Sequence, residues 1–199
     1  MSRLVFAFMW LVHFLPLAGM ARVGNAVGNL LFWLIPERRK VTRINLHKCF
    51  PRKSAEEREQ LARAHFRAFT RAFIEQGILW WSPPGRIKKL VQLEGLENLK
   101  SGNPKTIVFA PHFVGFEATL APKLAGRANI ACFLAYARRL PRGAGYALVV
   151  RPLPPSLPQE SPTRWLNRAL EALVRECPGQ YLWGYNRYKT PRGAKGPPA

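Results

Sequence analysis

The segment Thr106 to Glu117 reads T-I-V-F-A-P-H-F-V-G-F-E, and the fold can be predicted outward from it. Its first five residues form an apolar, β-branched run that ends at Pro111, a pattern typical of a short buried strand. In α/β sheets, ligand crevices open beyond the C-terminal ends of the strands. The segment therefore predicts an α/β fold with a candidate site directly after this strand, where His112 and Glu117 follow.

His112 and Glu117 have the chemistry of a general base and of the acid that orients it. A neutral histidine can remove a proton from an alcohol, and a carboxylate bonded to its second ring nitrogen fixes the required tautomer. The spacing allows this pairing if His112 lies in the turn and Glu117 in the first turn of a following helix. A structural histidine at the strand end is the alternative, and the spacing alone leaves it open.

The charge of the chain limits the classes of partner and site. Lysines and arginines number 31 against 11 acids, which gives a net charge of +20, and every acid is a glutamate. The lack of aspartate excludes a Ser-His-Asp triad and a DxD metal site. High basicity favours an anionic partner. Long apolar segments beside the charges favour an anionic membrane surface over nucleic acid, for which the sequence has no motif.

The cysteines are few and widely spaced. Cys49, Cys132 and Cys177 form no C-x-x-C pair. This pattern indicates neither a disulfide framework nor a zinc site. We interpret them as small apolar residues in a reducing compartment.

The N-terminal part of the chain is apolar. Leu4 to Ala21 has no charge and is near the lower length limit for a spanning helix. A signal peptide is the alternative, but no A-x-A-like cleavage site follows. We expect a membrane anchor or half-embedded helix, which Val23 to Ile35 extends into a helical hairpin through Gly24 and Gly28 in small-xxx-small spacing. The basic cluster that follows at residues 36–40 predicts that the rest of the chain is cytoplasmic.

A long amphipathic helix is predicted next. Ser54 to Glu57 reads S-A-E-E, a capping box, and the helix should run to about Gln76 and stop at Gly77. Two faces are expected along it: an apolar one with Ala62, Phe66, Phe69 and Phe73, and a basic one with Arg63, Arg67 and Arg71. The basic face is either solvated or directed at lipid.

Further strands and one more helix are predicted downstream. Val91 to Glu94 alternates like a short strand. Asn129 to Arg138 and Tyr146 to Val150 are predicted to form a hairpin through a Pro/Gly-rich turn. Ser161-Pro162 opens an amphipathic helix. Tyr181 to Trp183 is interpreted as a last strand.

In combination, several segments resemble the lauroyl/myristoyl acyltransferases of bacterial lipid A biosynthesis, within the lysophospholipid acyltransferase superfamily. Ala110 to Glu117 is similar to the H-x4-D/E motif of that superfamily. The apolar N-terminus and the capped helix also fit. So do Arg43-Ile44-Asn45-Leu46, Cys49-Phe50-Pro51 and the ending Gln180 to Thr190, which reads Q-Y-L-W-G-Y-N-R-Y-K-T.

The resemblance implies transfer of a fatty acyl chain from acyl-carrier protein to a hydroxyl of a lipid A precursor, at the cytoplasmic face of the bacterial inner membrane. His112 would take the hydroxyl proton as the oxygen attacks the thioester carbonyl, and Glu117 would orient His112 and balance its charge. Arg187 and Lys189 are candidate contacts to the acceptor headgroup, since phosphate favours their donors; surface charge is the alternative. No metal or diffusible cofactor is implied, and no nucleic acid.

Compared with that family, the middle of the chain is short, because Ile130 to Phe133 resembles a later part and follows Glu117 closely. We expect a membrane anchor over residues 1–36, an α/β domain with a reduced mixed sheet flanked by helices over residues 37–189, and a disordered basic tail over residues 190–199. The predicted function is acyl transfer in lipid A biosynthesis. The alternative is an inactive, basic, membrane-bound remnant of such an enzyme.

Overall fold

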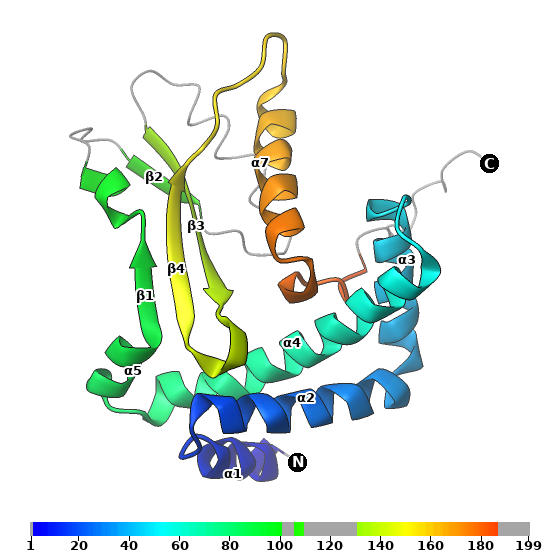
Figure 1. Ribbon diagram of the computed structural model, residues 1–199, viewed down its shortest axis with the longest axis vertical. Helices are drawn as coiled ribbons and strands as arrows, with labels where there is room; N and C mark the ends of the chain where they lie inside the picture. The colour runs from blue at the N-terminus through cyan, green and yellow to red at the C-terminus, as the bar shows by residue number, and fades with distance from the viewer. Residues whose placement is uncertain (1, 101–105, 110–130, 187–199) are drawn as a thin grey trace.

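The computed structural model describes residues 2–100, 106–109 and 131–186 (Figure 1). In chain order the elements are α1 (Ser2–Val12), α2 (Leu17–Leu34), α3 (Pro36–Cys49), α4 (Ala55–Trp81), α5 (Pro84–Leu90), β1 (Val91–Glu94), η1 (Leu96–Lys100), β2 (Thr106–Phe109), β3 (Ala131–Arg139), η2 (Pro141–Gly143), β4 (Tyr146–Pro152), α7 (Pro162–Glu176) and η3 (Pro178–Gln180). Helices α1, α2 and α4 form a layer at one end, and a four-stranded mixed sheet stands above it with α7 alongside. The α/β class is confirmed.

Helix α4 is the longest element and starts where the sequence predicts. The Ser54 hydroxyl accepts a hydrogen bond from the Glu57 amide at 3.1 Å, and the Glu57 carboxylate accepts one from the Ser54 amide at 2.8 Å. The predicted end at Gly77 is wrong, because the helix continues to Trp81 and stops before Pro83 and Pro84. A side chain at Gly77 would lie 3.1 Å from the Met9 carbonyl oxygen, so this glycine allows α1 to cross closely.

Helix α2 packs tightly along α4. A β-carbon on Gly24 would lie 3.0 Å from the Arg71 α-carbon, and one on Gly28 would lie 2.6 Å from the Arg67 α-carbon. The close packing expected from the small-xxx-small spacing is therefore confirmed, with α4 as the partner. The basic face of α4 is turned toward α2, where Arg67 and Arg71 pack against Gly28 and Gly24.

The N-terminal apolar segment is not one helix. Helix α1 ends at Val12, and α2 begins after Pro16, which cannot continue a preceding helix. The Arg86 guanidinium donates to the carbonyl oxygens of His13 and Leu15 at 2.5 and 2.6 Å, so a cation sits at the C-terminal end of α1. Across the described residues, every helix is too short or too polar to cross a bilayer.

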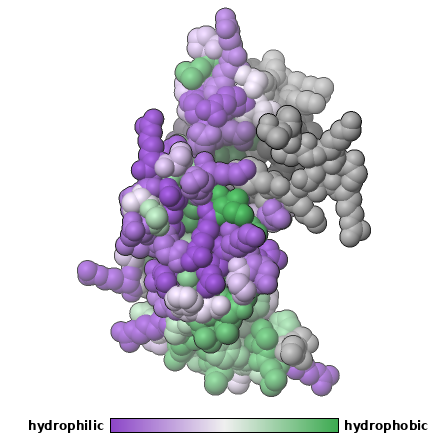
Figure 2. Space-filling model, turned by 90° about the vertical axis from the view of Figure 1, so that its right-hand side faces the viewer, coloured by the Kyte–Doolittle hydropathy of each residue, from purple (hydrophilic) through white to green (hydrophobic). Residues whose placement is uncertain are grey.

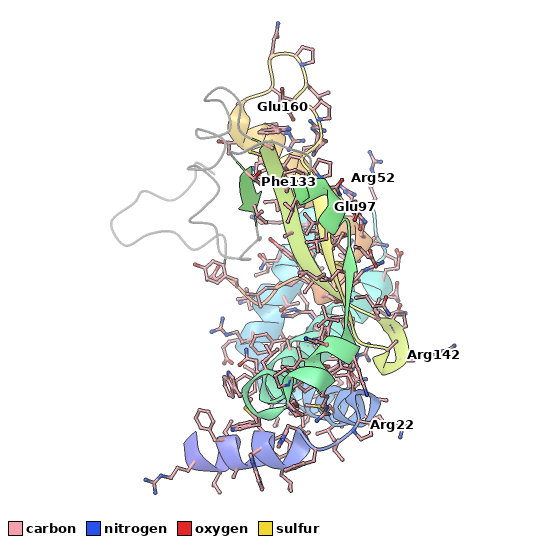
Figure 3. The ribbon with its side chains drawn as sticks, turned by 90° about the vertical axis from the view of Figure 1, so that its left-hand side faces the viewer. Arg22, Arg52, Glu97, Phe133, Arg142 and Glu160 are labelled. Carbon is pink, nitrogen blue, oxygen red and sulfur yellow. The ribbon has the colours of Figure 1, made fainter. Side chains whose placement is uncertain are left out.

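The sheet has the order β1-β4-β3-β2. Strands β3 and β4 form the antiparallel hairpin that the sequence predicts, while β1 pairs with β4 and β2 with β3 in parallel. The tip of the hairpin rests on the start of α2: a β-carbon on Gly143, whose φ is +78°, would lie 2.8 Å from the Ala18 α-carbon. Figure 3 shows Arg142 at this tip and Arg22 on the neighbouring helix.

Helix α7 covers one face of the sheet. Its cap is Ser161, whose hydroxyl accepts from the Arg164 amide at 3.2 Å, as the sequence predicts. Leu173 packs with Tyr136 and Val149 of the sheet. The strand predicted at Tyr181 to Trp183 is wrong: this stretch is irregular, and Trp183 is buried among helices with Phe32, Leu46, Ala62 and Phe66.

Large apolar side chains are exposed at the helical end of the molecule. Figure 2 shows a hydrophobic lower end beneath a hydrophilic surface. On α1 and the turn after it, the exposed side chains are Leu4, Val5, Phe6, Phe8, Trp10, Leu11, Phe14 and Leu15. An apolar surface of this extent is unusual for a soluble monomer and marks an interaction site.

Candidate functional site

All four predicted site residues lie outside the described part of the chain. His112 and Glu117 fall between β2 and β3, and Arg187 and Lys189 follow Asn186. Their roles therefore stay predictions. The strand that leads to His112 is confirmed as β2, which ends at Phe109, three residues earlier.

A cavity lies beyond the C-terminal end of β2. Phe109 pairs in register with Leu134 on the parallel strand β3. The next three residues of β3, Ala135 to Ala137, line a cavity of about 480 Å³. Because the two strands run in the same direction, β2 ends beside the residue of β3 that directly precedes this stretch, and ligands of α/β sheets bind beyond such strand ends.

The cavity has mostly apolar walls. It is bounded by α4, β3, α7 and residues 177–186, which we call the C-terminal segment, and its lining includes Ala68, Phe69, Ala72, Leu173, Val174 and Leu182. A smaller cavity of about 330 Å³ shares His65, Phe69 and Leu182 with it, so the two adjoin. Phe69, on the predicted apolar face of α4, lines both cavities and is 53% exposed. Such a space suits an elongated apolar ligand.

His65 lines both cavities, and both of its ring nitrogens are hydrogen-bonded. Its Nδ1 donates to the Tyr181 carbonyl oxygen at 2.9 Å, and its Nε2 accepts from the Gly184 amide at 3.1 Å. Burial lowers the pKa of His65 to about 4, so the ring is neutral near pH 7. With both nitrogens occupied by backbone groups, His65 holds the C-terminal segment and is not a candidate base.

Asn45 joins two of the segments that carry the family resemblance. Its side-chain amide donates to the carbonyl oxygens of Trp183 and Tyr185 at 2.6 and 2.8 Å. The Phe50 ring packs edge-on against Trp183, with 5.5 Å between the centroids. The Arg38 guanidinium donates to the Gly184 carbonyl oxygen at 3.1 Å. The motif around Asn45 therefore binds the C-terminal segment. Asn45 and Trp183 are 138 positions apart in the sequence, so residue spacing could not predict this contact.

A buried ion cluster closes the other end of the larger cavity. The Glu75 carboxylate, 5% exposed, lies 2.7 Å from Arg139 of β3 and 3.4 Å from Arg71 on its own helix. Burial and then the neighbouring Glu75 raise the pKa of Tyr146, whose ring lines the cavity beside Arg139. We call these four residues the Glu75 cluster. It attaches the β3–β4 hairpin to α4 and gives the cavity one polar end.

The described residues contain no group of three histidines, cysteines or glutamates that could hold a metal ion. Cys132 and Cys177 are half-buried, and burial raises the pKa of both thiols. Neither is therefore an activated nucleophile.

Comparison with known proteins identifies relatives of one kind. Residues 1–123 match the family described as bacterial lipid A biosynthesis acyltransferase. The lipid A biosynthesis palmitoleoyltransferase of Escherichia coli (strain K12) is 35% identical over 112 residues, which cover 55% of this chain and 37% of that protein. A lipid A biosynthesis acyltransferase of Haemophilus influenzae is 36% identical over 106 residues, covering 52% of this chain and 34% of that protein. The chain thus matches little more than a third of the length of these relatives.

A third relative aligns along most of both chains. The lipid A biosynthesis lauroyltransferase of Escherichia coli (strain K12) is 23% identical over 272 residues, covering 92% of this chain and 89% of that protein. An alignment of this length exceeds the 199 residues of the chain, so it contains internal gaps, as expected for a shortened middle. The family match covers more than half of the chain and includes the H-x4-E motif. The chain therefore belongs to the bacterial lipid A biosynthesis acyltransferase family.

Proposed function

We propose that this chain transfers a fatty acyl group from acyl-carrier protein to a hydroxyl of a lipid A precursor. The observation that carries the proposal is the family match over residues 1–123, which includes His112 and Glu117. The relatives named above are acyltransferases of lipid A biosynthesis. The position of the cavity beyond β2 supports the same site.

In the proposed reaction, His112 takes the proton of the acceptor hydroxyl as its oxygen attacks the thioester carbonyl carbon. The new C–O bond forms, the C–S bond breaks, and the proton passes to the departing thiolate. Glu117 holds His112 in the tautomer that accepts the proton. Three residues of chain keep the His112 α-carbon within about 11 Å of that of Phe109, the last residue of β2.

The two adjoining cavities would receive the acyl chain. Their walls are largely aliphatic and aromatic, and each buried methylene contributes about 0.8 kcal/mol to binding an apolar chain. Arg187 and Lys189 would contact acceptor phosphates, since they directly follow the segment that His65 and Asn45 hold against the smaller cavity.

The exposed apolar side chains of α1 would insert into a membrane surface. Phe6, Trp10 and Leu11 are each at least half exposed, and Arg3 and Arg22 flank them in the sequence. Interfacial binding combines such apolar area with attraction of cations to anionic headgroups. We place this surface on the cytoplasmic face of the bacterial inner membrane.

The internal gaps in the lauroyltransferase alignment favour a second candidate, a membrane-bound remnant without acyl transfer. Assaying the full chain in membranes, with acyl-carrier protein thioester and a lipid A precursor, separates the two. We expect transfer by the wild type and its loss in His112→Ala and Glu117→Ala. His47→Ala, at an exposed position on α3, is the matched control and should retain activity. No transfer by the wild type would establish the remnant.

A further inference from the structure

Three arginines converge on one pair of aromatic rings where α2 meets α3 and α4. The guanidinium carbons of Arg39, Arg43 and Arg63 lie 5.4, 5.8 and 4.6 Å from the centroid of the Phe32 ring. Arg39 and Arg63 also lie 5.4 and 5.0 Å from the Trp33 ring. Cation–π contacts of this kind fix planar guanidiniums in place. We call these three residues the arginine cluster.

The arginine cluster carries excess positive charge. Within the part of the chain that the structure describes, Glu59 is the one carboxylate paired with it, at 2.7 Å from Arg43 and 3.8 Å from Arg63. The hydrogen bond from Arg43, above all, lowers the pKa of Glu59, so this carboxylate is ionised at neutral pH. Three cations and one anion leave a net charge of about +2, which repels itself unless an anion is added.

The guanidiniums retain donors for such an anion. Arg39 uses one nitrogen on the Phe32 carbonyl oxygen at 3.1 Å, and Arg43 uses two on Glu59. The side chains of Arg43 and Arg63 are 50% and 35% exposed, so a ligand can approach from solvent. A planar guanidinium binds phosphate oxygens in pairs, which makes arginine the favoured residue for a phosphate held between several donors.

Apolar side chains border the arginine cluster on one side. Leu30, Trp33 and Leu34 share the exposed face of the last turn of α2 and are 57%, 60% and 63% exposed. Figure 2 looks onto the side of the molecule where α3 stands above the end of α2, and there the surface changes from hydrophobic below to hydrophilic above. Lipid phosphates lie at such a boundary when a protein rests on a membrane.

We propose that Arg39, Arg43 and Arg63 form a binding site for the phosphomonoester headgroup of a membrane lipid, whose acyl chains lie against Leu30, Trp33 and Leu34. The net charge of the arginine cluster matches a dianionic phosphate, and the apolar border distinguishes a lipid from free phosphate. None of these residues lines either cavity, so the site is separate from that proposed for acyl transfer. The inference rests on the proposed membrane association.

The test is flotation of the full chain with phosphatidylcholine vesicles that contain phosphatidic acid, or phosphatidylglycerol at matched surface charge. We expect the wild type to prefer phosphatidic acid. Arg39→Gln with Arg63→Gln should abolish this preference and weaken binding to phosphatidic acid about tenfold or more, because it removes two charged donors. Arg52→Gln with Arg175→Gln removes the same number of charges at exposed positions, Arg52 being directed away from the helical end in Figure 3, and this control should keep the preference.

The possible outcomes distinguish the headgroup site from membrane association as such. Equal binding of the wild type to both vesicles, or equal losses in the cluster variant and in Arg52→Gln with Arg175→Gln, would overturn the headgroup site and leave membrane association standing. Failure to bind any vesicle would overturn both. Inorganic phosphate that raises the melting temperature of the wild type, with no preference between vesicles, would assign the site to free phosphate instead. Leu34→Ser keeps all three arginines and both aromatic rings, and it should lower vesicle binding without changing the response of the melting temperature to phosphate.

Discussion

Near its start, α4 holds the C-terminal segment through neutral groups, whereas near its end it holds the β3–β4 hairpin through buried charges. At the first place, His65 of α4 and Asn45 of the neighbouring α3 bond to backbone groups of the segment, and Trp183 packs with Leu46, Ala62 and Phe66. At the second, Glu75 lies between Arg71 and Arg139. Both ends frame the same cavity. A neutral attachment responds to loss of packing and to acid, while an ionic one responds to removal of a single charge.

The largest effect is expected from Trp183→Ala at the neutral end. Trp183 is 2% exposed, and its indole nitrogen donates to the Pro178 carbonyl oxygen at 2.7 Å. Its loss leaves a cavity and should lower the free energy of unfolding by about 5 kcal/mol. Urea titration in detergent measures this, with Trp80→Ala as the control, because Trp80 is 52% exposed and should cost less than about 1 kcal/mol. Equal losses would contradict the packing assigned to Trp183.

A slightly smaller effect is expected from Glu75→Gln at the ionic end. The substitution leaves two buried guanidiniums without a counter-charge, and Arg71 already has one buried nitrogen without a hydrogen-bond partner among the described residues. We expect a loss of about 4 kcal/mol in the free energy of unfolding. Glu97→Gln makes the same change at an exposed position and should be nearly neutral. A loss below about 1 kcal/mol in Glu75→Gln would show that the hairpin does not depend on this carboxylate.

Acid should weaken the attachment of the C-terminal segment to α4, because it protonates His65. Its pKa is about 4 in the folded protein and 6.5 without burial, so the unfolded chain binds the proton first. The contribution of the neutral His65 ring to the free energy of unfolding is complete above pH 6.5, falls as the pH drops from 6.5 to 4, and is absent below pH 4. Over this window it amounts to about 3 kcal/mol. His65→Gln should lose this part of the pH dependence of the unfolding free energy. An identical slope in both proteins would contradict the buried neutral ring.

Local signals in the sequence predicted much of the fold. The capping box at Ser54 and the cap at Ser161 place two helices correctly, because a cap depends on residues within one turn. Apolar runs, alternation and turn residues predicted the four strands of the sheet. Gly24 and Gly28 predicted close helix packing but could not identify α4 as the partner, because any helix can pack closely against small residues.

Long-range contacts account for the errors. Gly77 reads as a helix end, but it is a crossing point for α1, which lies far away in the sequence. Tyr181 to Trp183 has the composition of a strand, yet Asn45 and His65 hold its backbone away from the sheet. Both ring nitrogens of His65 bond to backbone groups, a contact with residues more than 110 positions away that no local signal predicts. The predicted pair His112 and Glu117 lies outside the described residues, so only the strand before it is confirmed.

The central claim is that His112 is the base for acyl transfer at the cavity beyond β2. The most direct measurement is single-turnover transfer from acyl-carrier protein thioester to a lipid A precursor, by the wild type and by His112→Ala under the same conditions. We expect product with the wild type and a rate lowered by about 10²- to 10⁴-fold in the variant, because a general base has been removed. Equal rates in the two proteins would contradict it.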